Sequence, residues 1–144
     1  MKINLNLPGP ADLIRVGFKS EHSHGTDHAF APLRIALQAL CDINVWLLRH
    51  RQFPSIYNGR IKYAAEGPNK EDWYTVEDIH KYGYGDCEDL ACARAAEYVV
   101  RGINAYPDCS HKWIGGILLI HIFVRFPDGR IEDPSKQLGM KGDA

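Results

Sequence analysis

The chain has 144 residues, of which 45% are hydrophobic and 24% charged, and its formal net charge is −1. This length suits one domain with a hydrophobic core and is too short for two. The near-neutral charge excludes a broad basic surface of the kind that binds nucleic acid or an anionic membrane. No apolar run approaches a membrane span and no signal-peptide segment is recognisable, so we expect a cytoplasmic protein.

Residues 1–54 are expected to form an N-terminal part dominated by helix. Residues 1–7 alternate as a short strand would, and residues 11–18 are ambiguous between helix and strand. A polar loop follows that holds three histidines, His22, His24 and His28. Imidazoles are common metal ligands, but no cysteine stands nearby at zinc-type spacing. We therefore expect a solvated loop and keep a metal site as the alternative.

A long helix is predicted from Pro32 to about His50, because apolar residues recur there at three- and four-residue spacing. The Phe53-Pro54 pair is expected to end it. A second, shorter helix is predicted to start at Thr75, with Asp78 as its capping partner. The apolar stripe of the first helix indicates a core-facing surface made of Leu33, Ala36, Leu37, Leu40, Cys41, Leu47 and Leu48.

Residues 83–89, with the sequence Gly-Tyr-Gly-Asp-Cys-Glu-Asp, are the stretch around which we expect the chain to be organised. The two glycines allow a sharp turn, and Asp86 stands at an N-cap position with Asp89 three residues later. Residues 90–101 then follow a helical pattern that Gly102 ends. Cys87 is therefore predicted to lie in the first turn of a helix.

Two opposing effects act on the thiol of Cys87. Unpaired N–H groups and the helix dipole favour the nucleophilic thiolate, whereas the carboxylates of Asp86, Glu88 and Asp89 raise the pKa of the thiol. A cysteine at such a place is also often a small buried apolar residue. The four cysteines form no C-x-x-C pair, so we expect reduced thiols, with structural roles for Cys41 and Cys92.

The C-terminal half has the composition of strands. Residues 103–106 are compatible with a strand, and residues 107–112 are expected to form a loop. Residues 117–126 are rich in β-branched and aromatic side chains, residues 127–129 form a turn, and residues 130–133 begin a partner strand. This pattern predicts a β-hairpin.

His121 lies on the predicted hairpin strand, and Asp133 lies across the turn from it. A single histidine in a strand is more often a hydrogen-bonded core residue than a catalyst. However, the hairpin brings Asp133 back towards His121, and a carboxylate orients an imidazole and makes it more basic. If the sheet packs on the helix start, Cys87, His121 and Asp133 form a nucleophile, a base and an orienting acid. His111 is a rival base, disfavoured by its expected loop setting.

Five segments together resemble the transglutaminase-like cysteine proteinases of bacteria. They are Trp-Tyr-Thr-Val-Glu at residues 73–77, Gly-Tyr-Gly-Asp-Cys-Glu-Asp-Leu-Ala at 83–91, Arg-Gly-Ile-Asn-Ala at 101–105, His-Ile-Phe-Val at 121–124 and Asp-Pro-Ser at 133–135. The resemblance covers about residues 55–136. It implies an α+β, papain-like fold in which a cysteine-bearing helix packs on a small antiparallel sheet. The single domain of residues 1–144 would then hold a catalytic core at 55–136 and a tail at 137–144.

The resemblance also implies roles for residues. Cys87 would attack a carbonyl carbon, His121 would transfer the proton, and Asp133 would hold the ring. The N–H of Cys87 would form half of an oxyanion hole, with Asn58 or Trp73 as the second donor. Some relatives bind calcium beside the cysteine, which makes Asp86, Glu88 and Asp89 candidate ligands; capping is their alternative role.

The resulting expectation is a cysteine hydrolase that cleaves an amide or isopeptide bond in a protein or peptide, with no required cofactor. An acyl transferase would use the same triad. The alternative from another class is a non-catalytic module of this fold. Short members of this kind look like those encoded by bacteriophages, so such a module could be a virion or assembly component.

Overall fold

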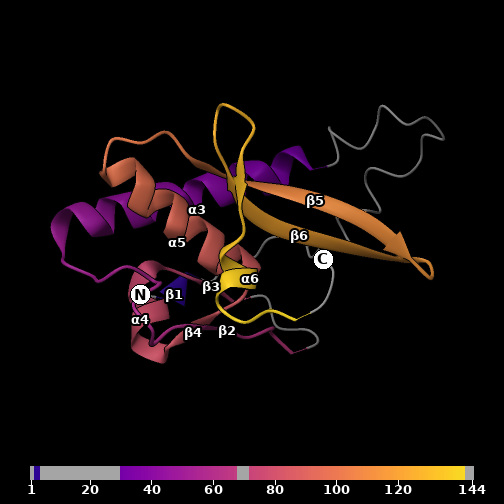
Figure 1. The fold of residues 1–144 in the computed structure, drawn as a ribbon, viewed down its shortest axis with the longest axis horizontal. Coiled ribbons are helices and arrows are strands. Elements are labelled where there is room, and N and C mark those ends of the chain that lie inside the picture. Colours follow the sequence, from indigo (N-terminus) through magenta and orange to yellow (C-terminus); the bar gives the residue numbers. More distant parts are fainter. Residues whose placement is uncertain (1, 4–29, 68–71, 142–144) are drawn as a thin grey trace.

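Short strands and helices alternate along the chain in the computed structural model, which describes residues 2–3, 30–67 and 72–141 (Figure 1). The expected mixed α and β class is confirmed. The predicted elements in residues 4–29, including the His22, His24 and His28 loop, lie outside the described residues. The elements are β1 (Lys2–Ile3), α3 (Ala31–His50), β2 (Lys62–Tyr63), β3 (Trp73–Tyr74), α4 (Val76–Tyr82), β4 (Tyr84–Gly85), α5 (Cys87–Val100), β5 (Tyr106–Ile114), β6 (Ile117–Arg125), β7 (Ile131–Glu132) and α6 (Pro134–Gln137).

The main core lies between α3, α5 and one face of the β5–β6 hairpin. The predicted stripe of α3 faces inward, with Leu37, Leu40 and Cys41 fully buried. Small residues line the facing side of α5, which lets the two helices approach closely and fill the space between them. The cluster is completed from α5 by Ala91, Cys92, Ala95 and Ala96, and from the strand β6 and its end by Ile122, Val124 and Phe126.

Helix α3 meets the length and hydropathy criteria of a membrane span, with a mean hydropathy of 1.3 over its best window. The expectation that no segment reaches this composition is therefore wrong. The core helix of a soluble protein meets the same criteria. The buried face of α3 packs on α5 and on the sheet, and its other face carries charged side chains, such as Asp42 and Arg49. The core accounts for the buried part of this apolar composition, and Ile35 and Trp46 are exposed.

Both predicted capping boxes are confirmed. At the start of α4, Thr75 N–H donates to Asp78 Oδ2 over 3.1 Å, and Asp78 N–H donates to Thr75 Oγ1 over 3.4 Å. At the start of α5, Asp86 N–H donates to Asp89 Oδ2 over 3.2 Å, and Asp89 N–H donates to Asp86 Oδ1 over 3.3 Å. These reciprocal bonds satisfy N–H groups that have no partner within a helix. They make Cys87 the first residue of α5.

A parallel strand pair holds the segment before Cys87 in place, and the sequence did not indicate it. Strands β2 and β4 pair with Tyr63 opposite Gly85. Lys62 N–H donates to Gly83 O over 3.1 Å, and Ala64 N–H donates to Gly85 O over 2.9 Å. The two-residue strands are too short for a period-two pattern to be recognised. Their pairing brings Tyr63 beside the cysteine motif.

Strand β5 corrects the expectation of a loop at residues 107–112 and of a strand at 103–106. Residues Tyr106–Ile114 pair antiparallel with Ile117–Arg125 along their whole length. Gly115 and Gly116 form the two-residue turn with φ values of 57° and 77°. Such positive values give the turn the twist of its strands, which favours glycine at both positions. The glycine pair between two isoleucines is a sequence signal for this hairpin that the loop expectation did not take into account.

The chain after β6 folds back on the core and adds a third strand, so the sheet order is β5-β6-β7. The predicted partner strand is confirmed at Ile131–Glu132, and it ends one residue before Asp133. Asp133 instead caps the short helix α6. Part of the segment called a tail is also packed, because Tyr63 N–H donates to Leu138 O over 2.9 Å and Met140 N–H donates to Ser135 O over 2.8 Å.

The close packing of Gly85 against the start of α5 predicts that Gly85→Ala destabilises the protein. A Cβ atom there would lie 3.0 Å from Asp89 Cβ and 3.3 Å from Leu90 Cδ2. We expect the free energy of unfolding in urea to fall by about 1–3 kcal/mol through overpacking. Gly67→Ala is the control, because a Cβ atom there meets nothing within 4 Å. Equal effects of the two substitutions would contradict this packing.

Candidate active site

His121 and Asp133 form a direct hydrogen-bonded pair, as expected from the predicted hairpin of residues 117–126 and 130–133. His121 Nε2 lies 2.7 Å from Asp133 Oδ2, and both side chains are largely buried. Asp133 Oδ1 accepts the N–H of Lys136, which fixes the carboxylate as the cap of α6. Because a carboxylate only accepts hydrogen bonds, this contact assigns the ring proton to Nε2. Nδ1 of the neutral ring is then a proton acceptor.

Cys87 lies against β6 at the residue after His121. The backbone N–H of Ile122 lies near its sulfur and favours the thiolate. Its thiol donates to Glu88 Oε2 over 3.2 Å. Among the described interactions there is no hydrogen bond between Cys87 and His121. The thiol therefore lies near the β6 backbone at the residue after His121, and it is engaged by the carboxylate of Glu88.

The sheet topology explains why the Ile122 N–H is free to meet the sulfur. N–H groups alternate between the two sides of a strand. Phe126 N–H donates to Arg130 O over 3.0 Å, so the N–H groups of even-numbered residues in β6 point to the side of β7. Strand β7 ends at Glu132, which pairs with Val124. The N–H of Ile122 points to the same side of β6 as that of Val124, but it lies past the end of β7 and has no β7 residue opposite it. The start of α5, with Cys87, lies near it instead.

Burial and negative charge keep the Cys87 thiol protonated. Burial raises its pKa most, and the charges of Glu88 and Asp86 raise it further, against the opposing hydrogen bond from Ile122 N–H. Of the two effects weighed from the sequence, the carboxylates therefore outweigh the helix start. A thiolate would form only if another group took the proton.

The three acidic residues beside Cys87 lie in contact with one another. Burial, with the charges of Glu88 and Asp89, raises the pKa of Asp86 to about 12. Asp89 Oδ1 accepts the N–H of Tyr74 over 2.7 Å. Within the described residues, no group of three or more His, Cys, Asp or Glu side chains is arranged to hold a metal ion. Capping accounts for the Asp86 and Asp89 contacts, and the calcium site stays a prediction.

The two predicted oxyanion donors lie in different surroundings. Trp73 is buried in the main core, against which Cys87 also packs. Asn58 is exposed and lines a cavity of about 270 Å³ together with Arg60 and His80. Neither side chain has a hydrogen bond to Cys87 among the described interactions, so both roles stay predictions.

Two further side chains bear on the choice of base and donor. Tyr63 is one that sequence reasoning missed: burial raises its pKa, and the charges of Cys87, Asp86 and Glu88 raise it further, so its phenol lies within electrostatic range of the thiol. His111, the rival base, lies in β5 rather than in a loop. Because Ser110 pairs with His121, His111 is on the opposite face of the sheet, where its ring packs on Phe30.

A partly buried polar cluster around Glu132, also missed, ties α5 to the strand that precedes Asp133. Glu132 Oε1 accepts from Tyr57 OH over 2.5 Å and from Arg94 Nε over 2.9 Å, and Oε2 accepts from Tyr98 OH over 2.5 Å. The guanidinium of Arg94 lies over both tyrosine rings, at 4.5 and 4.3 Å from their centroids. The interruption of an alanine-rich helix by an arginine was the only sequence signal of this cluster.

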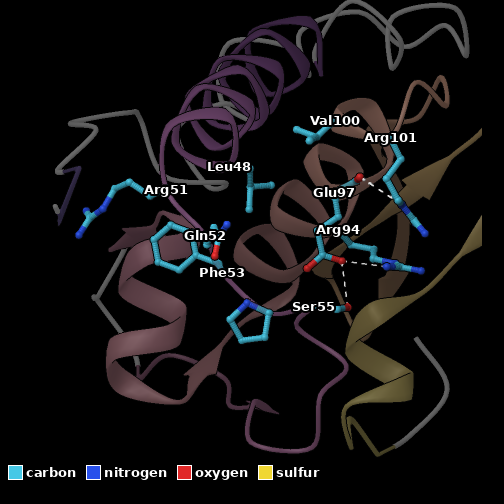
Figure 2. A pocket seen from close by; sticks show the side chains of 10 residues that line it. Leu48, Arg51, Gln52, Phe53, Ser55, Arg94, Glu97, Val100 and Arg101 are labelled. Carbon is cyan, nitrogen blue, oxygen red and sulfur yellow. Dashed lines mark hydrogen bonds and ion pairs between the residues drawn. The ribbon is translucent and has the colours of Figure 1, made fainter.

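An open groove of about 720 Å³ lies beside the same part of α5 (Figure 2). Arg94 and Glu97 pair in its wall over 2.8 Å, and Ser55 Oγ donates to Glu97 over 3.1 Å. None of the three predicted catalytic residues lines this groove. The groove is therefore separate from the candidate active site.

The remaining cysteines agree with the structural roles predicted for two of them. Cys41 and Cys92 are fully buried in the main core, and Cys92 Sγ donates to Leu37 O over 3.4 Å. Cys109 is half-buried on β5. All four described cysteines are free thiols. Cys109 lies on β5 next to Ser110, the cross-strand partner of His121, and Cys87 lies at the start of α5 near the backbone of Ile122.

Comparisons of the chain with protein-family models, with curated proteins and with solved structures gave no match. The family resemblance of the motif therefore rests on the residues themselves. The function has to be inferred from the geometry of Cys87, His121 and Asp133.

The Glu132 cluster predicts a pH-dependent loss of stability in Glu132→Gln. Burial opposes ionisation of Glu132, but hydrogen bonds from Tyr57, Tyr98 and Arg94 hold its pKa below the ordinary 4.5. The ionised carboxylate therefore stabilises the folded protein fully above pH 4.5, and this stabilisation is lost as the pH falls through the folded-state pKa. At neutral pH we expect Glu132→Gln to lower the free energy of unfolding by about 1.5–3 kcal/mol.

Urea unfolding at neutral pH and at pH values below the ordinary pKa of glutamate measures this effect. The difference in the free energy of unfolding between the wild type and Glu132→Gln should become smaller in acid. Asp128→Asn is the control, because Asp128 pairs with Arg130 on the exposed surface and should contribute little. A gap that persists unchanged in acid would show that the charge of Glu132 is not what stabilises the cluster.

Proposed function

We propose that the protein is a cysteine hydrolase that cleaves an amide or isopeptide bond in a protein or peptide, on a papain-like, transglutaminase-like fold. The observation that carries the proposal is the 2.7 Å contact of His121 Nε2 with Asp133, combined with the position of the Cys87 sulfur at the next backbone N–H of the same strand. This arrangement supports a nucleophile, a base and an orienting acid in sequence along one sheet edge.

In the first step, the Cys87 thiol passes its proton to Nδ1 of His121 and the sulfur attacks the substrate carbonyl carbon. Asp133 stabilises the imidazolium that forms, through its contact with Nε2. The carbonyl oxygen becomes an oxyanion, which the N–H of Cys87 stabilises, since the first N–H groups of a helix have no intrahelical partner. Asn58, Trp73 or the Tyr63 hydroxyl supplies the second hydrogen bond.

In the second step, the intermediate collapses and the C–N bond breaks. The amine leaves with the proton from His121, and the acyl group stays on sulfur as a thioester. Water then gives a proton to His121 and attacks the thioester, which releases the acid and restores the thiol. An amine in place of water would complete an acyl transfer with the same residues.

A non-catalytic module of the same fold, such as a virion or assembly component, is the second candidate. The hydrogen bond from the Cys87 thiol to Glu88 favours it, because this contact and the surrounding charge oppose thiolate formation. For a hydrolase, this carboxylate has to release the thiol when substrate binds. The reactivity of Cys87 therefore separates the two candidates.

We expect iodoacetamide to alkylate Cys87 in the folded protein near neutral pH faster than the other three cysteines. His121→Ala should slow this reaction by about tenfold or more, because the thiol loses its proton acceptor. Mass spectrometry of tryptic peptides gives the rate at each cysteine. His111→Ala is the matched control and should leave the rate at Cys87 unchanged. Slow alkylation that is insensitive to His121→Ala would support the non-catalytic module.

Glu88→Gln is expected to raise the alkylation rate of Cys87 near neutral pH. Removing this carboxylate lowers the pKa of the thiol, and each unit of pKa raises the thiolate fraction about tenfold while the thiol is mostly protonated. The pH dependence of alkylation measures the pKa directly. Asp42→Asn, on an exposed part of α3, is the control for charge alone. An unchanged pH profile in Glu88→Gln would contradict the role of Glu88.

A further inference from the structure

The sheet face that carries His121 continues into an exposed apolar strip towards the tip of the β5–β6 hairpin. Side chains two apart in a strand share a face, so His121, Leu119 and Ile117 lie in one row. The register places Ile114 directly beside Ile117. Leu119 is 44% exposed, Ile117 65% and Ile114 54%. Figure 1 shows the hairpin running away from α3 and α5 at this end.

Core packing does not account for these side chains. The core face of β6 holds the alternate residues Ile122 and Val124, which are 3% and 0% exposed. Large apolar residues are also exposed on α3, but Ile35 and Trp46 there lie about three turns apart. At the hairpin, by contrast, three aliphatic side chains adjoin one another on one face, and such contiguous patches mark interaction surfaces.

The side chains of the strip recur at the same spacing as the alternate side chains of an extended peptide. Alternate side chains of a strand recur at about 6.8 Å, both in β6 and in an extended peptide laid along it. From His121 to Ile117 the row covers about 13 Å, or about four residues of such a peptide. A peptide on this strip would therefore reach the imidazole that acts on its carbonyl group.

The aliphatic side chains of the strip define the class of peptide. Residues 109–127 contain no aspartate or glutamate, and the aliphatic side chains of the strip offer no hydrogen-bonding group. We propose that this strip binds an extended substrate segment that presents apolar side chains at alternate positions. The proposal rests on the proposed hydrolase function and names its substrate class.

The test uses the full chain and two hexapeptide amides, one alternating serine with leucine and one alternating serine with glutamine. Fluorescence anisotropy of labelled peptides measures binding, and protection of Cys87 from iodoacetamide measures whether the bound peptide reaches the site. We expect the leucine peptide to bind at least about tenfold more tightly than the glutamine peptide, given the apolar area each leucine can bury. Only the leucine peptide should protect Cys87.

Leu119→Ser and Ile117→Ser are the diagnostic variants, each at an exposed position that folding tolerates. Each should weaken the leucine peptide by about fivefold or more through lost apolar contact. Alkylation of Cys87 without peptide should stay unchanged. Ile35→Ser is the matched control, since Ile35 is 71% exposed on α3 and lies off the strip.

The outcomes separate this proposal from the proposed function. Alkylation that depends on His121 but no preference for the leucine peptide would overturn the strip and leave the hydrolase standing. Binding of the leucine peptide that Leu119→Ser weakens, with Cys87 insensitive to His121→Ala, would leave a peptide-binding surface without the chemistry. If the wild type forms a dimer or binds vesicles, Leu119→Ser abolishes this, and neither peptide binds, the strip belongs to another partner and the proposal is overturned.

Discussion

The carboxylate of Asp89 is the contact on which the geometry of the candidate site depends. It is almost fully buried, and it accepts the backbone N–H groups of Tyr74 and Asp86 from two separate segments. The contact joins β3 to the first turn of α5, while pairing of β2 with β4 holds the same turn from another side. Together these bonds set where α5 starts, and therefore where the sulfur of Cys87 meets the edge of β6.

The site combines an oriented imidazole with a restrained thiol. The contact with Asp133 prepares His121 to accept a proton, but burial and two neighbouring carboxyl groups hold that proton on Cys87. In the proposed mechanism, these opposing influences lower the thiolate fraction of Cys87 until a substrate displaces Glu88 from the sulfur.

The hairpin β5–β6 has two faces with different environments. One face packs through Ile122 and Val124 on the helices, and the other carries His121 and the exposed strip of Leu119 and Ile117. Because the strands are long and regular, the same alternation that builds the core also aligns the strip with the imidazole. The hairpin thus connects the proposed chemistry to the proposed substrate surface.

Local patterns determined much of this structure. The helical stripe of α3, the capping residues Thr75 and Asp86, and the hairpin that brings Asp133 to His121 could all be read from the sequence, because their contacts join residues close along the chain. The strand at 106–114 was missed through the neglected Gly115-Gly116 turn.

The tertiary structure alone decided the parallel pairing of Tyr63 with Gly85, the contact of the sulfur with Ile122 N–H, and the Glu132 cluster. These contacts join segments more than twenty residues apart, and each depends on how the helices and the sheet pack. The balance of charge on Cys87 was also undecided in sequence, because the effect of a carboxylate on a thiol depends on distance and burial. Residue types therefore identified the candidate chemistry, and packing determined the state of the thiol.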